Sequence, residues 1–158
     1  MAKINFKREI TDSLEHGIER VTQALAEQGF GILSRIDMHS KIKEKTGKEI
    51  IPTVILGACN PNLAYEAYTA NSDVASLLPC NAVLRQLAPT RISVELVAPS
   101  AMMLVLGDDK LVKLAADADK RIDYCLVSVE LKDRVRRAWI DSECPASDHL
   151  PYWVEIDL

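Results

Sequence analysis

Two cysteine–asparagine pairs are the residues of this sequence best suited to chemistry. Cys59 and Asn60 end the apolar segment VILGACN, and Cys80 and Asn81 open the segment CNAVLRQL. Each pair is expected where a strand meets a loop. A thiol is a potential nucleophile and a soft ligand, and an asparagine amide can orient a small polar molecule. The repeated pair predicts a site that uses both cysteines.

Cys59 has the more informative surroundings. Asn60 favours the cap of a helix and Pro61 favours its first turn, so a helix should begin directly after the thiol. The backbone N–H groups of a helix start stabilise a thiolate or a bound anion. The alternative is structural, because cysteines in apolar strands are commonly small buried hydrophobes and Asn60 can be only a cap.

Asp37 and His39 follow an earlier predicted strand. Asp37 can be a carboxylate in a cleft or, more simply, the cap of the short helix after it. His39 can be a base or a ligand, or merely an exposed side chain. Binding of a soft metal by His39 with Cys59 and Cys80 would require three distant segments to converge.

These residues leave more than one function open. We expect a module that binds a small anionic or thiol-reactive molecule beside the cysteine–asparagine pairs. The alternative is a thiol-based sulfur-transfer or redox enzyme or carrier with Cys59 as its nucleophile, although no base is evident near it. The residues indicate no particular cofactor. They contain neither a dinucleotide fingerprint nor a phosphate-binding loop, and we expect no metal site.

The spacing of apolar residues predicts the strands and helices that position these residues. Strands alternate with helices and one hairpin, which predicts an α+β domain in two layers: a mixed sheet of about five strands with helices mainly on one face. The run TVILGAC is apolar on both faces and should be a central strand. The predicted strands cover about 3–10, 30–38, 53–59, 80–87 and 91–98, and the helices cover about 12–28, 39–46, 61–71 and 109–139.

The separation of Cys59 and Cys80 depends on strand direction. Cys59 ends its strand and Cys80 begins the next, so they share an end of the sheet only if the two strands are antiparallel. A parallel crossover would separate them by about 20 Å. We predict that they lie close together, because a repeated motif is hard to explain as two unrelated core positions.

The composition of the chain indicates which kinds of partner and which cellular compartment to expect. The formal net charge is −4 and the pI is about 5.4, which argues against nucleic acid as the main partner. No apolar run is long enough for a membrane span, and the start lacks the pattern of a secretory signal. A cytoplasmic location with reduced thiols is therefore expected.

The segments GFGILSRIDMHSKIKEKTG, VILGACNPNLAYEA and LLPCNAVLR, in this order, resemble the bacterial and archaeal family known as domain of unknown function 302. The resemblance covers roughly residues 4–128. It implies a compact α+β domain, a homodimer and no established activity. The resemblance implies that the recurrent positions of the family correspond here to the candidate site residues named above, with Pro61 among them: Asp37, Cys59, Asn60, Pro61, Cys80 and Asn81.

The end of the chain lies beyond this resemblance. We divide the sequence into a domain at 1–129 and a C-terminal extension at 130–158, packed on the domain as a helix end, a loop and a short strand. Every second residue from Tyr152 is apolar (Tyr152, Val154, Ile156 and Leu158). This spacing predicts a strand over 152–157 that pairs with a sheet edge in its own subunit or a neighbour's.

Overall fold

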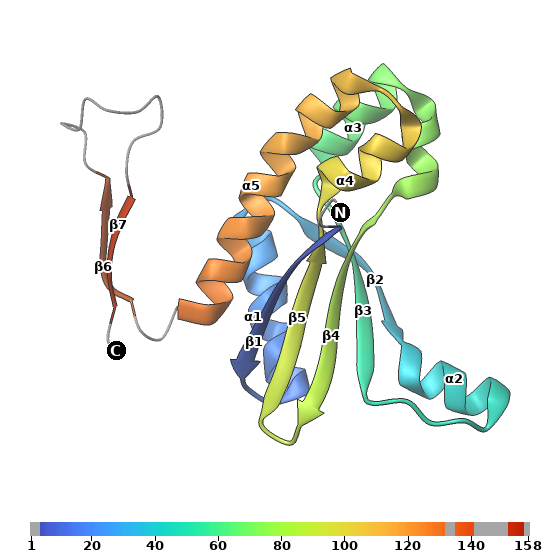
Figure 1. Cartoon of the computed structure of the whole chain (residues 1–158), viewed down its shortest axis with the longest axis vertical. Coiled ribbons are helices and arrows are strands. Elements are labelled where there is room, and N and C mark those ends of the chain that lie inside the picture. The colour runs from blue at the N-terminus through green and yellow to red at the C-terminus, as the bar shows by residue number, and fades with distance from the viewer. Residues whose placement is uncertain (1–3, 132–134, 141–151, 157–158) are drawn as a thin grey trace.

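A five-stranded antiparallel sheet, covered on one side by helices, forms the body of the molecule (Figure 1). The computed structural model describes residues 4–131, 135–140 and 152–156. The elements in chain order are β1 (Asn5–Thr11), α1 (Leu14–Glu27), β2 (Gly31–Asp37), α2 (Met38–Thr46), β3 (Thr53–Cys59), α3 (Pro61–Ala70), the 3₁₀ turn η1 (Ser72–Leu77), β4 (Cys80–Ala88), β5 (Arg91–Val97), α4 (Pro99–Met103), the 3₁₀ turn η2 (Leu104–Leu106), α5 (Asp109–Leu131), β6 (Val135–Ile140) and β7 (Tyr152–Ile156).

The strand order is β1-β5-β4-β3-β2, and every pairing in it is antiparallel. The predicted α+β class is confirmed, whereas the prediction of a mixed sheet is wrong. After β3 the chain passes through α3 and η1 and returns beside β3 in the opposite direction, so no parallel crossover forms. The middle strand is β4. The apolar segment β3 is an inner strand between β4 and β2, which accounts for its burial.

The main core lies between the sheet and the two longest helices, α1 and α5 (Figure 1). Residues alternate along the strands, so that Leu56, Leu84 and Val94 face these helices and are almost completely buried. Gly17 allows α1 to approach closely, because a Cβ atom there would lie 2.1 Å from Cδ1 of the buried Ile92. The opposite face of the sheet, which we call the open face, carries no helix in the described part of the chain.

Strand β2 changes its facing direction partway along. Its register against β3 shifts between Ile32 and Ser34, so Leu33 is an extra residue. Ile32 therefore packs against the core, whereas Ile36 lies on the open face and is 44% exposed. A regular strand over 30–38 would place Ile32 and Ile36 on one face, and the bulge places them on opposite faces.

Sequence signals located most helix ends. Helix α2 ends at Thr46, with Gly47 as its C-cap, in agreement with the helix predicted over 39–46. The N-cap of α1 is Ser13, whose Oγ accepts a hydrogen bond from the His16 amide at 3.3 Å. The preceding residue, Asp12, accepts a hydrogen bond from the Arg20 guanidinium at 3.0 Å.

The C-terminal segment differs from the prediction. Helix α5 ends at Leu131, and the predicted helix up to residue 139 is wrong, since β6 occupies Val135–Ile140. The predicted last strand is present as β7, but it pairs antiparallel with β6 in a separate two-stranded sheet and not with the five-stranded one. Within the described residues, no helix combines the length and the apolar character needed to cross a membrane.

Candidate functional site

A small pocket lies where the Cys59 end of β3 meets α3, α4 and α5. Its volume is about 50 Å³. The described residues that line it are almost all apolar and include no charged side chain: Phe30, Cys59, Asn60, Leu63, Ala64, Ala67, Leu78, Cys80, Pro99, Met103, Leu111, Leu114, Ala115 and Ala118. Three of the predicted site residues, namely Cys59, Asn60 and Cys80, are therefore brought together.

The two cysteines meet because β3 and β4 are antiparallel. The register pairs Ala58 with Cys80, so Cys59 is one residue beyond the residue that faces Cys80 across the ladder. The predicted proximity is confirmed, and the parallel arrangement that would have separated the cysteines is not present. Cys80 is buried, whereas Cys59 is partly exposed.

Burial favours the neutral form of both thiols. Burial raises the pKa of Cys59 above its ordinary value. Burial, together with the negative charges of Cys59 and Asp119, raises the pKa of Cys80 to about 11. At this pKa roughly one Cys80 molecule in 10⁴ is a thiolate at pH 7. Burial therefore opposes the stabilisation of a thiolate that we expect from the helix start beside Cys59.

Asn60 acts as the predicted helix cap. Its Oδ1 accepts hydrogen bonds from the amides of Asn62 and Leu63, both at 3.2 Å, and Pro61 occupies the first turn of α3. Asn60 is buried, and its Nδ2 lies so near Gly29 that a Cβ atom there would be 3.0 Å away. The cap therefore fixes the direction in which α3 leaves β3 and forms one wall of the pocket.

Gly57 packs the neighbouring strands closely behind the cysteines. A Cβ atom at Gly57 would lie 2.5 Å from Oγ of Ser34 and 2.7 Å from Cγ of Pro79. Pro79 directly precedes Cys80, so the missing side chain of Gly57 leaves room for the proline ring at the start of β4.

Other predicted site residues lie elsewhere. Asp37 pairs in register with Val54 at the start of β3, about 17 Å along the strand from Cys59 at 3.4 Å per residue. Its side chain forms an ion pair with Arg35 at 2.9 Å and makes no cap hydrogen bond to α2. Asn81 is exposed on β4 and does not line the pocket.

His39 is also remote from the cysteines. Its Nδ1 lies 3.0 Å from the carbonyl oxygen and 3.2 Å from the amide nitrogen of Thr53, at the start of β3. The soft-metal combination of His39 with Cys59 and Cys80 therefore does not assemble. No group of three or more potential metal-ligating His, Cys, Asp or Glu residues occurs among the described residues.

The pocket wall formed by α4 and α5 was not identified from the sequence. Met103 and Leu111 belong to a second hydrophobic cluster that also contains Val74 from η1. Helix α4 is short. The sequence feature that could have predicted it is Pro99, which follows a strand and lies in the first turn of the helix, where proline is favoured. Asp119 of α5 accepts hydrogen bonds from the amide of Ser100 at 3.1 Å and from its hydroxyl, which fastens the two helices together.

The raised pKa values predict slow alkylation. Cys59 should react with iodoacetamide at pH 7.5 more slowly than glutathione in the same tube, since less of it is thiolate. Its rate should still increase above pH 9, and Cys80 should react more slowly at every pH. Peptide mapping by mass spectrometry measures each cysteine separately. A Cys59 rate that reaches its plateau below pH 8 would contradict the neutral-thiol interpretation.

Comparison with known proteins identifies relatives of the domain but no characterised activity. A family model described as "Domain of unknown function DUF302" matches residues 6–129. The crystal structure of an uncharacterised conserved DUF302 protein from Bacillus stearothermophilus is 29% identical, with a TM-score of 0.76, and the match covers 82% of this chain and 100% of that one. None of the curated proteins matches the chain. The family match covers β1 through most of α5 and stops before β6 and β7.

Proposed function

Since the chain belongs to the DUF302 family of domains of unknown function, we propose its function from the pocket: it is a binding module for a small, neutral, thiol-reactive molecule. The observation that carries this proposal is the pocket between β3, α3, α4 and α5, where Cys59 and Cys80 are surrounded by apolar side chains. Its volume of about 50 Å³ corresponds to roughly four water-sized groups. A ligand of about that many non-hydrogen atoms fits it.

The chemistry of the lining favours a neutral ligand over an anion. Apolar walls do not compensate a buried charge. The nearby charge that affects Cys80 is Asp119, which is negative and would repel an anion. A neutral thiol is a soft, weakly polar group that tolerates such surroundings. Of the two ligand classes expected from the sequence, the pocket therefore supports the thiol-reactive class.

Short aldehydes have the required size and reactivity. Propanal contains four non-hydrogen atoms. It can be held without reaction, or a thiol can add reversibly to its carbonyl: sulfur bonds to the carbonyl carbon, and the thiol proton moves to the oxygen. No oxidant, reductant or co-reactant is needed. A catalytic thiolate, as in the sulfur-transfer or redox alternative, receives less support because both pKa values are raised.

The expected result is that propanal binds and that propionate, its anionic counterpart, does not. Methyl NMR spectra of the full chain should show shifts of Met103 and Ala115 as propanal is added and none with the same concentration of propionate. Cys59→Ser and Cys80→Ser should each weaken binding, since each removes one thiol from the pocket. Stronger shifts with propionate would refute the neutral-ligand proposal.

Helix α3 supplies a matched pair of variants. Ala64 lines the pocket, whereas Ala70 is exposed near the end of the same helix. Ala64→Leu should fill the pocket and abolish the propanal-dependent shifts, and Ala70→Leu should leave them unchanged. Equal loss in both variants would indicate a general effect on α3 rather than occupancy of the pocket.

A further inference from the structure

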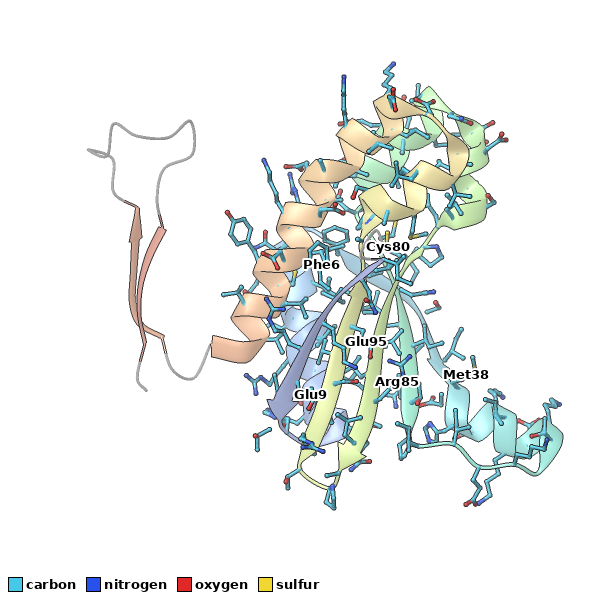
Figure 2. All side chains as sticks on the ribbon, viewed as in Figure 1. Phe6, Glu9, Met38, Cys80, Arg85 and Glu95 are labelled. Atoms are coloured by element: carbon cyan, nitrogen blue, oxygen red, sulfur yellow. The ribbon has the colours of Figure 1, made fainter. Side chains whose placement is uncertain are left out.

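We propose that a second site, a groove between α2 and residues 47–52, binds a free α-amino acid with an apolar side chain. The groove lies at the opposite end of β3 from Cys59, since Asp37, directly before α2, pairs with Val54. Figure 2 shows Met38, the first residue of α2, well away from Cys80. The groove shares no residue with the pocket beside the cysteines, so the two proposals can fail separately.

The groove is large enough for a whole amino acid. Its volume is about 460 Å³, and sites for small molecules commonly measure about 300–1,000 Å³. In contrast to the pocket beside the cysteines, its lining combines charged side chains of both signs with apolar ones: His39, Ser40, Lys43, Glu49, Ile50 and Pro52. A ligand that matches this lining carries both charges and an apolar part.

His39 is held in place by the start of β3. The register of β2 with β3 ends at the pair Asp37–Val54, so β2 provides no neighbour for Thr53. The imidazole of His39 takes that place, with Nδ1 3.0 Å from the carbonyl oxygen and 3.2 Å from the amide nitrogen of Thr53. When this amide donates to Nδ1, the hydrogen of the neutral ring is on Nε2. Nε2 is therefore available to donate to a ligand in the groove.

Ser40 and Lys43 add donors along the same helix. Lys43 follows His39 by four residues and Ser40 by three, so the three side chains lie on one side of α2. An imidazole N–H, a hydroxyl and an ammonium are all donors that a carboxylate accepts, and the charged donor makes the strongest of these hydrogen bonds. This side of the groove therefore suits the carboxylate of an amino acid.

Glu49 supplies the opposite charge directly beside Lys43. Nζ of Lys43 lies 2.6 Å from Oε1 of Glu49, and this ion pair uses one oxygen of the carboxylate and one of the three lysine donors. An α-amino acid has its carboxylate and its ammonium on the same carbon. It can therefore place the carboxylate beside Lys43 and the ammonium beside Oε2 of Glu49, with the ion pair intact. The four charges then alternate in sign, whereas Glu49 would repel a carboxylate alone and Lys43 an amine alone.

Ile50 and Pro52 favour an apolar side chain on the amino acid. Ile50 is 42% exposed and directly follows Glu49, so apolar surface adjoins the charged groups of the groove. Covering this surface removes it from water, which favours a branched aliphatic side chain such as that of leucine. An acidic or basic side chain would gain nothing from it.

The test is a methyl NMR titration of the full chain with L-leucine. The signals of Ile50 should shift, and those of Ala115 in the pocket beside the cysteines should not. Two probes each lack one charged group of leucine: isocaproate has no ammonium, and isoamylamine has no carboxylate. Each should bind about fivefold more weakly, since each loses one exposed ion pair. Equal affinity for either probe, or no shift of Ile50 with L-leucine, overturns the proposal.

Matched variants separate this site from a general effect of charge. Lys43→Gln and Glu49→Gln should each raise the dissociation constant for L-leucine about fivefold. Lys41→Gln and Glu44→Gln are the controls, because Lys41 and Glu44 pair with one another at 3.3 Å and do not line the groove. The side chains of Lys41 and Lys43 are equally exposed, at 66%. Circular dichroism confirms that all four variants are folded. Equal weakening by Lys41→Gln and Lys43→Gln overturns the proposal, since the net charge of this region alone would then explain the binding.

Discussion

Replacing Gly57 by alanine should destabilise the domain by about 1–3 kcal/mol, because a single methyl group has no room there. The new Cβ would lie 2.5 Å from Oγ of Ser34 and 2.7 Å from Cγ of Pro79. Ser34 can rotate its hydroxyl, but the proline ring is rigid and must move with the start of β4. For a domain of this size the melting temperature should decrease by roughly 3–10 °C.

Gly31 provides the control for this prediction. It lies in the neighbouring strand β2, and a Cβ atom there would have no neighbour within 4 Å. Gly31→Ala should therefore leave the urea unfolding midpoint nearly unchanged. Because Pro79 precedes Cys80, Gly57→Ala should also weaken propanal binding. Equal destabilisation by the two variants would mean that loss of glycine flexibility, and not the steric contact, determines the result.

Leu111→Ala should have the larger effect on stability. Leu111 is almost fully buried, lines the pocket and packs in the cluster that joins η1, α4 and α5. Truncating a buried leucine typically costs about 2–5 kcal/mol, since apolar contacts are lost and a cavity remains. This cavity would adjoin the pocket, so the variant should accept a longer aldehyde such as hexanal.

The matched control is Leu104→Ala, the same change at an exposed leucine of η2. Its unfolding free energy should change by less than about 0.5 kcal/mol. Methyl NMR titration with hexanal should show binding to Leu111→Ala and not to the wild-type protein or to Leu104→Ala. Destabilisation without the new binding would indicate that the surrounding helices collapse into the space.

Local signals in the sequence predicted the helices and strands well. The pairing of the strands, and the face of the sheet on which each side chain lies, required the structure. Asn60 and Pro61 have preferred backbone positions at the start of a helix, and they located the start of α3. Strand direction has no comparable local signal, which is why a mixed sheet was predicted. The extra residue at Leu33 is likewise invisible in composition, because a bulge is defined by the partner strand.

The sequence predicted the site residues that belong to β3, α3 and β4 but not those of α4 and α5. Cys59, Asn60 and Cys80 stand out because the motif repeats close together in sequence. Met103 and Leu111 resemble ordinary core residues, and they line the pocket only because α4 and α5 cover the end of β3 and β4. Asp37 was included because it follows a strand, but the antiparallel register places it at the opposite end of β3. Sequence spacing identifies reactive residues, whereas topology decides which of them meet.

The bulge at Leu33 also affects how this protein can aggregate. β2 is an edge strand, and its unpaired backbone groups are a template on which strands of other molecules can add. A bulge interrupts the regular spacing of these groups and twists the edge, so a flat partner strand cannot form a continuous ladder with it. The extra residue therefore disfavours growth of an intermolecular sheet along β2. Deleting Leu33 would straighten this edge and should increase fibril formation in concentrated solution.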